Sequence, residues 1–70
     1  MVLVNKIREL RFKNCEMTQQ ELAVAVGVTR MTIYSIEKGK FIPSTLLAFK
    51  IARVLNQSIV DVFSLEDENT

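Results

Sequence analysis

Apolar residues recur at helical spacing in five segments of the chain, and polar residues mark where most of these segments begin. In residues 5–14, the apolar positions of an amphipathic helix are Ile7, Leu10 and Phe12. Ser44 is the expected N-cap of a longer helix over residues 45–55, with an apolar stripe formed by Leu47, Ala48, Ile51, Ala52 and Leu55. Ser58 and Asp61 have capping-box spacing and predict a short last helix that carries Ile59, Val62 and Phe63.

Two further helices are predicted between these segments. Thr18 and Glu21 have the spacing of a capping box, in which each side chain bonds a backbone N–H left free at a helix start. The helix that they begin ends at Gly27 and directs inward Leu22, Ala23 and Val26. Thr29 is the expected N-cap of the next helix, which Gly39 ends. No segment alternates over five or more residues, so an all-α fold is expected.

The spacing of small and apolar residues within these two helices predicts a helix-turn-helix. Ala23 lets the helices approach, and Gly27, four residues later, takes the left-handed conformation that a sharp turn needs. Val28, Ile33 and Ile36 then anchor the second helix from beneath. The opposite face of that helix is polar and is left free to enter the major groove of DNA.

The chain has 70 residues, enough for one small domain, and its charges are unevenly distributed. Residues 1–57 hold all nine Lys and Arg residues and four acids, for a charge of +5, whereas residues 58–70 carry −4. A basic body suits contact with phosphates and predicts binding that weakens in salt, although a solvated surface with a frayed tail has the same charges. We expect one domain over residues 1–65 and an acidic, disordered tail over residues 66–70.

The composition argues against several kinds of site. The chain has no histidine and one cysteine, so we expect neither a disulfide nor a metal site, and we interpret Cys15 as a small, half-buried filler. The sequence shows no activated cysteine, phosphate-cradling glycine loop or paired carboxylates, so an enzyme, a cofactor and a small-molecule ligand are not expected. No apolar run approaches the roughly 18 residues that span a membrane, and we expect a cytoplasmic protein.

These segments resemble the Cro/repressor-type helix-turn-helix regulators of the XRE family, in particular its short stand-alone members. The resemblance runs from NKIREL through MTQQELAVAVGVTR and TIYSIEKGK to PSTLLAFKIARVLNQSIVDVF, which is nearly the entire chain. It implies a compact, five-helix, lambda-repressor-like bundle whose recognition helix is the third, over residues 29–38. The linker KNCEM is one residue longer than the usual turn of the family, which affects the course of the first loop.

The residues expected to contact DNA are Gln19, Thr29, Arg30, Met31, Thr32, Tyr34, Ser35, Lys38 and Lys40. The resemblance implies that Gln19 contacts a phosphate or the first base and that the two lysines approach the DNA backbone. The guanidinium of Arg30 suits either a guanine edge or a phosphate, and the hydroxyls of Thr29 and Thr32 suit phosphates. For Tyr34 the alternative is partial burial in the core with the hydroxyl outside.

Two other positions matter for the interpretation of the resemblance. Many family members have a glutamine where this chain has Met31, and methionine favours apolar contact with a thymine methyl over the bidentate bonding of adenine. The family position of Glu37 usually pairs with a basic residue of the first helix. Arg11 is the natural candidate for this structural ion pair.

Regulators of this class generally bind as two-fold dimers to half-sites about one helical turn apart. Short family members sometimes add small strands from both termini to make the dimer, and both ends of this chain are apolar. We therefore expect residues 2–4 and 63–65 to come together in a dimer interface formed by Val2, Val4, Ile59, Phe63 and Leu65. The alternative is a contact within one chain that covers its own core.

The expected function is a sequence-specific transcriptional regulator, with repression as the expected effect, that binds a palindromic operator in double-stranded DNA as a homodimer. Two alternatives remain open. One keeps DNA binding but makes the chain an antitoxin or a control protein of a phage or restriction-modification system. The other is a protein-interaction module on the same fold, which predicts weak and salt-insensitive behaviour toward DNA.

Overall fold

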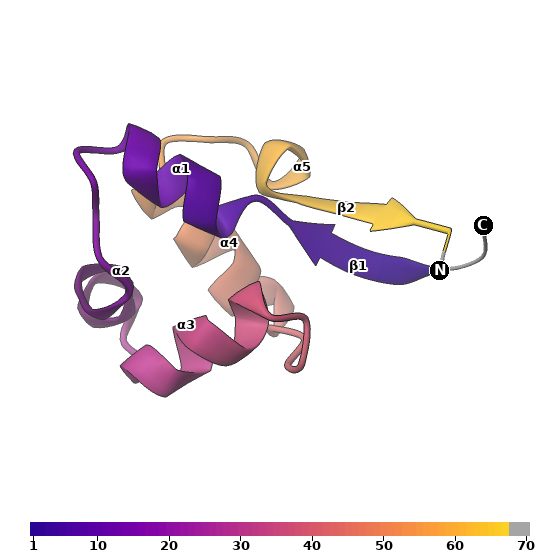
Figure 1. Ribbon diagram of the computed structural model, residues 1–70, viewed down its shortest axis with the longest axis horizontal. Helices are drawn as coiled ribbons and strands as arrows, with labels where there is room; N and C mark the ends of the chain where they lie inside the picture. Colours follow the sequence, from indigo (N-terminus) through magenta and orange to yellow (C-terminus); the bar gives the residue numbers. More distant parts are fainter. Residues whose placement is uncertain (68–70) are drawn as a thin grey trace.

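The computed structural model describes residues 1–67 and contains five helices flanked by two short strands (Figure 1). In chain order, the elements are β1 (Val2–Asn5), α1 (Ile7–Lys13), α2 (Gln19–Val26), α3 (Arg30–Glu37), α4 (Thr45–Val54), α5 (Ile59–Val62) and β2 (Phe63–Glu66). The expected helical, lambda-repressor-like bundle is confirmed, with short strands at its two ends. Within the described residues, no helix combines the length and the apolar character needed to cross a membrane.

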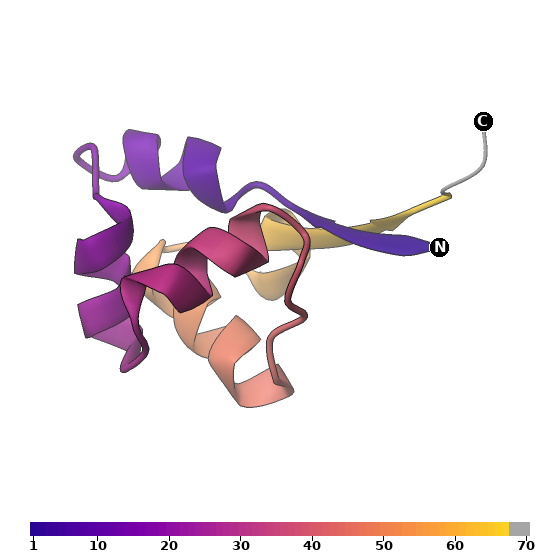
Figure 2. The same ribbon diagram turned by 60° about the horizontal axis from the view of Figure 1, so that its bottom comes forward.

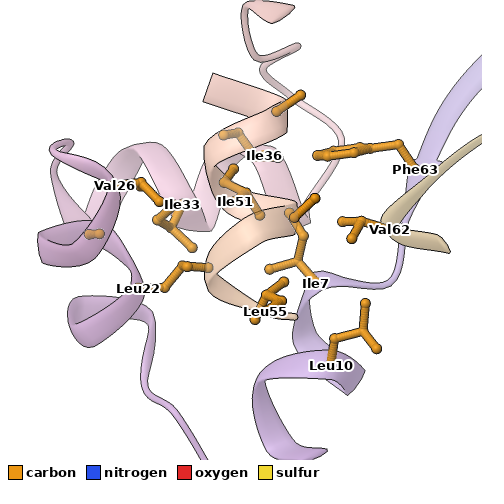
Figure 3. Close-up of a cluster of buried hydrophobic side chains, with 13 residues drawn as sticks. Ile7, Leu10, Leu22, Val26, Ile33, Ile36, Ile51, Leu55, Val62 and Phe63 are labelled. Carbon is orange, nitrogen blue, oxygen red and sulfur yellow. The ribbon is translucent and has the colours of Figure 1, made fainter. Parts of the chain in front are cut away.

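The hydrophobic core is built around α4. Figure 3 shows side chains of the other helices converging on Ile51 and Leu55 of α4. The large side chains with almost no solvent contact are Ile7, Leu22, Ile33, Ile36, Ile51 and Val62. Helical periodicity predicted an inward position for each of them, and burial of one such side chain stabilises a fold by about 1.5–3 kcal/mol.

Three of the expected helix starts form as predicted. Thr18 and Glu21 make the full capping box, since Thr18 Oγ1 accepts from Glu21 N at 3.0 Å and Glu21 Oε1 accepts from Thr18 N at 2.8 Å. Thr29 caps α3 and Ser44 caps α4 in the same manner, each accepting from the N–H three residues later. These bonds satisfy donors that a helix start would otherwise leave free.

The end of the chain differs from the sequence-based expectation. Ser58 makes no side-chain bond to the backbone of α5, because its hydroxyl donates instead to Asp61 Oδ2 at 2.7 Å, so the predicted capping box is absent. Phe63, expected in the last helix, begins β2, because its backbone pairs with β1. Glu66 was assigned to the acidic tail but is the last residue of β2, and tail residues 68–70 lie outside the described part.

The strands β1 and β2 form an antiparallel ribbon that projects from the helical body, with the N-terminus at its free end (Figure 1). The register pairs Val2 with Glu66 and Asn5 with Phe63. The base of the ribbon is tied to α3, since Asn5 Nδ2 donates to the carbonyl of Ile36 at 3.0 Å. The ribbon accounts for the elongated outline of the protein, which measures 35 × 21 × 20 Å.

One apolar position of α1 was predicted on the wrong side. Phe12 is 53% exposed, whereas Arg11 is 7% exposed and takes the inward position. At 100° per residue, Phe12 points about 140° away from Ile7, while the position four residues after Ile7 lies close to it. A cation therefore faces the protein interior and requires a partner there.

The first loop also follows a course that the sequence did not reveal. Cys15 and Glu16 both have positive φ angles, 57° and 53°, although neither is a glycine. Cys15 is exposed, so its interpretation as a half-buried filler is wrong. The loop is anchored to the body at Asn14, whose Nδ2 donates to the carbonyl of Val54 at 3.2 Å. This anchor holds the longer linker against the end of α4.

Candidate nucleic-acid interface

The turn between α2 and α3 depends on Gly27. Its φ angle is 81°, and its N–H and that of Val28 both donate to the carbonyl of Ala23, at 2.9 and 3.0 Å. A Cβ added at Gly27 would meet nothing within 4 Å, so the backbone conformation rather than lack of space requires a glycine. The turn, residues 27–29, therefore has the geometry that the sequence predicted for a helix-turn-helix.

The helix α3, predicted to be the recognition helix, has one buried side and one free side. Ile33 and Ile36 are buried in the core. Figure 2 shows α3 lying foremost across the helical body, with its outer side uncovered by other elements. Residues four apart share a helix face, so the outer side carries two adjacent stripes, Arg30, Tyr34 and Lys38 in one, Met31 and Ser35 in the other.

The first stripe lines a polar groove of about 580 Å³ that α3 forms with α1 and the start of α2. Its charged residues are Arg8, Glu9, Arg11, Arg30, Glu37 and Lys38, so cations outnumber acids. Tyr34 lies in this groove at 37% exposure and is not part of the core cluster. The Lys38 ammonium lies 5.8 Å from the centroid of the Tyr34 ring, a cation–π arrangement that positions both at the rim.

The second stripe lines a smaller hollow of about 300 Å³ on the other side of α3. Its lining residues are Thr29, Met31, Thr32, Ser35, Lys40 and Phe41. Met31 and Phe41 are both about half exposed, at 56% and 49%, and give this hollow an apolar wall. The nine residues expected to contact DNA are thus divided between two adjoining hollows, with Gln19, Arg30, Tyr34 and Lys38 in the polar groove.

Within the lining of the polar groove, Arg11 and Glu37 form the ion pair that the family resemblance implied. Arg11 Nε lies 2.7 Å from Glu37 Oε2, and Nη2 donates to Oε1 at 3.2 Å. The third guanidinium nitrogen, Nη1, donates to the carbonyl of Met17 at 2.7 Å. Both charged side chains are only 8% exposed, so this bidentate pair ties α1 to the end of α3 in a setting with little water.

Gln19 is joined to the same network. Its Nε2 donates to Glu37 Oε1 at 3.1 Å, which orients the amide at the start of α2. An amide nitrogen carries two hydrogens, so one donor of Gln19 remains for an external acceptor. The hydroxyls of Thr29 and Thr32 are also engaged, since they lie 3.1 Å apart and Thr29 Oγ1 accepts from the Thr32 N–H at 3.3 Å. These predicted contact residues are therefore held in place before any ligand arrives.

Sequence reasoning missed residues of both hollows, among them Arg8, Phe12 and Phe41. Arg8 and Phe12 of α1 line the polar groove, with the guanidinium carbon of Arg8 5.9 Å from the centroid of the Phe12 ring. Phe41 follows α3 and lines the smaller hollow. The four-residue spacing of Arg8 and Phe12 indicates a shared helix face, but only the packing of α1 shows that this face borders α3.

The residues expected at a dimer interface occupy different places. The two terminal strands do come together, within one chain. Because cross-strand partners share a face, the register puts Val2 and Val4 on one face of the ribbon and Leu65 on the other. Phe63 is 9% exposed and belongs to the core, and Ile59 is half-buried at the end of a separate hollow. A dimer through this set stays a prediction.

Comparison with known proteins places this geometry in a family. A model of the helix-turn-helix family matches residues 7–62, which contain all five described helices. A protein of Archaeoglobus fulgidus, named an uncharacterized HTH-type transcriptional regulator, is 57% identical over 63 residues, which cover 90% of this chain and 89% of that protein. YgzD of Bacillus subtilis, named in the same way, is 48% identical over 65 residues, covering 93% and 97% of the two chains. This chain belongs to the XRE-type helix-turn-helix family, among relatives that are named transcriptional regulators.

Proposed function

We propose that this chain is a sequence-specific DNA-binding transcriptional regulator whose α3 enters the major groove. The observation that carries the proposal is the two-sided character of α3. Ile33 and Ile36 are held in the core, while the outer side presents charged, hydroxyl-bearing and apolar side chains. An α-helix fits the major groove, where base pairs differ in their donors, acceptors and methyl groups. The buried side fixes the orientation of α3, and the outer side is available to bases.

The cations around α3 support contact with the DNA backbone. Arg8, Arg30 and Lys38 line the groove on one side of the helix, and Lys40 lines the hollow on the other. Cations on both sides of a helix suit the two phosphate backbones that flank the major groove. Each neutralised phosphate releases counterions, so we expect the affinity to fall as the salt concentration rises.

Within this proposal, Arg30 and Met31 are the main base-reading residues. Arg30 lies at the start of α3, where recognition helices contact base edges, and its guanidinium can grip a guanine in bidentate fashion. Met31 and Phe41 offer an apolar wall for a thymine methyl. Gln19, held by Glu37, keeps one amide hydrogen for a phosphate near the start of α2.

We further propose that the chain acts in the cytoplasm as a homodimer that represses transcription from a palindromic operator. One copy presents one recognition helix, which covers a single half-site. Two copies related by a two-fold axis would present two such helices to half-sites about one helical turn apart. Repression then requires only that the bound dimer occupy promoter DNA that the transcription machinery needs.

The decisive experiment is selection of bound sequences from a random pool of double-stranded DNA, sequenced after binding at two salt concentrations. We expect a palindromic motif that is enriched most strongly at the lower salt concentration. Lys13 provides a matched control, because it is exposed but lines neither hollow, and Lys13→Ala should recover the same motif. A pool without enrichment at either salt concentration would contradict the proposal and favour a protein-interaction module.

A further inference from the structure

Asn5 links three elements at the base of the ribbon. Its Oδ1 accepts from the N–H of Ile7 at 3.2 Å, which satisfies a donor left free at the start of α1. Its Nδ2 donates to the carbonyl of Ile36 at 3.0 Å, near the end of α3. Its backbone belongs to β1 and lies opposite Phe63 of β2. Asn5 therefore joins the ribbon, α1 and the end of α3.

The chain on the α1 side of Asn5 is held firmly in the body. The N–H of Lys6, the next residue, donates to the carbonyl of Val62 at 2.9 Å. Val62 and Ile7 are both core residues, with 1% and 0% exposure. Asn5 thus projects from a fixed part of the protein, so its bond to Ile36 sets the position of α3 and does not merely follow it.

The carbonyl that Asn5 bonds is one of the four that a helix leaves free at its end. The same oxygen also accepts from the N–H of Gly39 at 3.0 Å, a bond that closes α3 within one turn of the chain. The bond from Asn5 spans 31 residues instead, and it ties the backbone of α3 to β1. This second bond therefore fixes where the end of α3 lies in the fold.

A second tie lies at the adjacent residue of α3. The carboxylate of Glu37 holds Arg11 of α1 and Gln19 of α2. Asn5 holds the helix backbone, whereas Glu37 is held by its side chain. Two ties to different elements at neighbouring residues restrict rotation of α3 about its axis as well as its position. Rotation matters because successive side chains of a helix point about 100° apart.

We propose that Asn5 is a positioning residue for DNA recognition, which acts on the base-contacting side chains through α3. The inference rests on the proposed function above. Hydrogen bonds to base edges depend on the direction of each side chain, whereas phosphates attract cations with little regard to direction. Loss of the bond to Ile36 should therefore lower the affinity for the selected operator more than the affinity for unrelated DNA.

Asn5→Asp separates the two side-chain bonds of this residue. A carboxylate still accepts from the N–H of Ile7, but it has no hydrogen to donate to the carbonyl of Ile36. Asn14→Asp is a matched control, because Asn14 is also half-buried and its Nδ2 donates to the carbonyl of Val54 at the end of α4. Each substitution places a negative charge at the C-terminal end of a helix, which is unfavourable. Only Asn5→Asp does so at α3.

Anisotropy titrations on the operator and on unrelated DNA test the proposal. Asn5→Asp should lower the ratio of the two affinities by about tenfold, because one well-placed base contact discriminates by that order. Asn14→Asp should keep the wild-type ratio, since a partly unfolded sample lowers both affinities by the same factor. Asn5→Ala removes both side-chain bonds without adding a charge, and it should show the same fall as Asn5→Asp. Equal losses on both DNAs in the two Asn5 variants would overturn the proposal.

Hydrogen exchange of the free protein, followed by NMR, tests the same tie without DNA. Because the carbonyl of Ile36 also accepts from Gly39, Asn5→Asp should speed exchange of the Gly39 amide beyond what the loss of global stability explains. Asn14→Asp should speed it only as far as global stability falls. Unchanged exchange at Gly39 in Asn5→Asp would contradict the positioning role.

The two proposals fail in different ways. A wild-type protein that selects no operator would overturn the proposed function and, with it, the role of Asn5. A selective wild type whose preference survives intact in Asn5→Asp and in Asn5→Ala would overturn the role of Asn5 alone.

Discussion

The side-chain amide of Gln19 donates to the carboxylate of Glu37 at 3.1 Å, and that carboxylate also holds the guanidinium of Arg11 at 2.7 Å. Three helices therefore meet at one carboxylate: Arg11 comes from α1, Gln19 from α2 and Glu37 from α3. The start of α2 and the end of α3 are fixed relative to each other by this contact. A residue expected to touch DNA is thus positioned by a pair that lies beneath the surface.

Replacement of Glu37 by alanine should strongly destabilise the fold. The change leaves the guanidinium of Arg11, whose side chain is only 8% exposed, without its counter-charge. Loss of one partner of a buried ion pair lowers the unfolding free energy by about 3–5 kcal/mol. Urea unfolding followed by circular dichroism measures this loss directly. Glu16→Gln is the control, because Glu16 is exposed, and its unfolding free energy should stay within about 0.5 kcal/mol of the wild type. A stable Glu37→Ala protein would show that the pair contributes little.

The first loop offers a stabilising substitution. Cys15 has a φ angle of 57°, a left-handed conformation that costs a non-glycine residue about 1–2 kcal/mol. Cys15→Gly should therefore raise the unfolding free energy by up to about 1 kcal/mol after the extra freedom of glycine in the unfolded chain is subtracted. Thermal and urea unfolding both report this gain. Ala25→Gly, at an exposed helical position, should instead lower the unfolding free energy by about 1 kcal/mol. If Cys15→Gly lowered the unfolding free energy as much as Ala25→Gly does, the left-handed conformation of Cys15 would not be a source of strain.

Arg30 and Lys40 should differ in the way they contribute to DNA affinity. If Arg30 reads a base, Arg30→Ala costs about 1–3 kcal/mol on the selected operator and relaxes preference at one position. Lys40→Ala should lower the affinity for all DNA sequences by a similar factor, and it should reduce the steepness of log affinity against log salt by about one unit. Anisotropy titrations on the operator and on unrelated DNA, each over a range of salt, separate these effects. If Arg30→Ala lowered the affinity for the operator and for unrelated DNA by the same factor, Arg30 would be a phosphate contact and not a base contact.

The apolar wall formed by Met31 and Phe41 predicts recognition of a thymine methyl. Replacement of the contacted thymine by uracil removes only that methyl group and should cost about 0.8 kcal/mol, or about fourfold in affinity. If Met31 makes the contact, the Met31→Ala protein should bind the thymine and the uracil operators with equal affinity. If Phe41 makes it, the same should hold for Phe41→Ala. A wild-type protein that binds every uracil-substituted operator equally well would exclude this contact.

Local interactions explain why much of the fold was predictable. The N-caps Thr18, Thr29 and Ser44 each bond an N–H three residues away, so a short stretch of sequence contains both partners. Gly27 likewise stands where a left-handed turn requires it, whatever surrounds it. Helical periodicity also predicted the core side of α3, because Ile33 and Ile36 lie on one face. These features depend on residues within about one helical turn of each other.

The tertiary structure decided the secondary structure and burial of residues whose partners are far away in the sequence. Phe63 could continue α5 or begin a strand, and its pairing with Asn5, far away in the chain, selects the strand. Arg11 faces inward because the packing of α1 places it opposite Glu37, 26 residues later. The two hollows flanking α3 likewise need side chains from α1 and from the loop that contains Phe41.

The sequence by itself therefore determined where the helices lie, three of their N-caps, the sharp turn at Gly27 and the free face of α3. Each of these features follows from hydrogen bonds and residue spacing within a few positions of the chain, so it does not depend on contacts with residues far away in the sequence. Only the tertiary structure decided that Gln19 is held by Glu37 and that Leu46 and Phe49 form an uncovered apolar surface. Those outcomes depend on how whole helices pack, because a side chain is buried or exposed by what is placed against it.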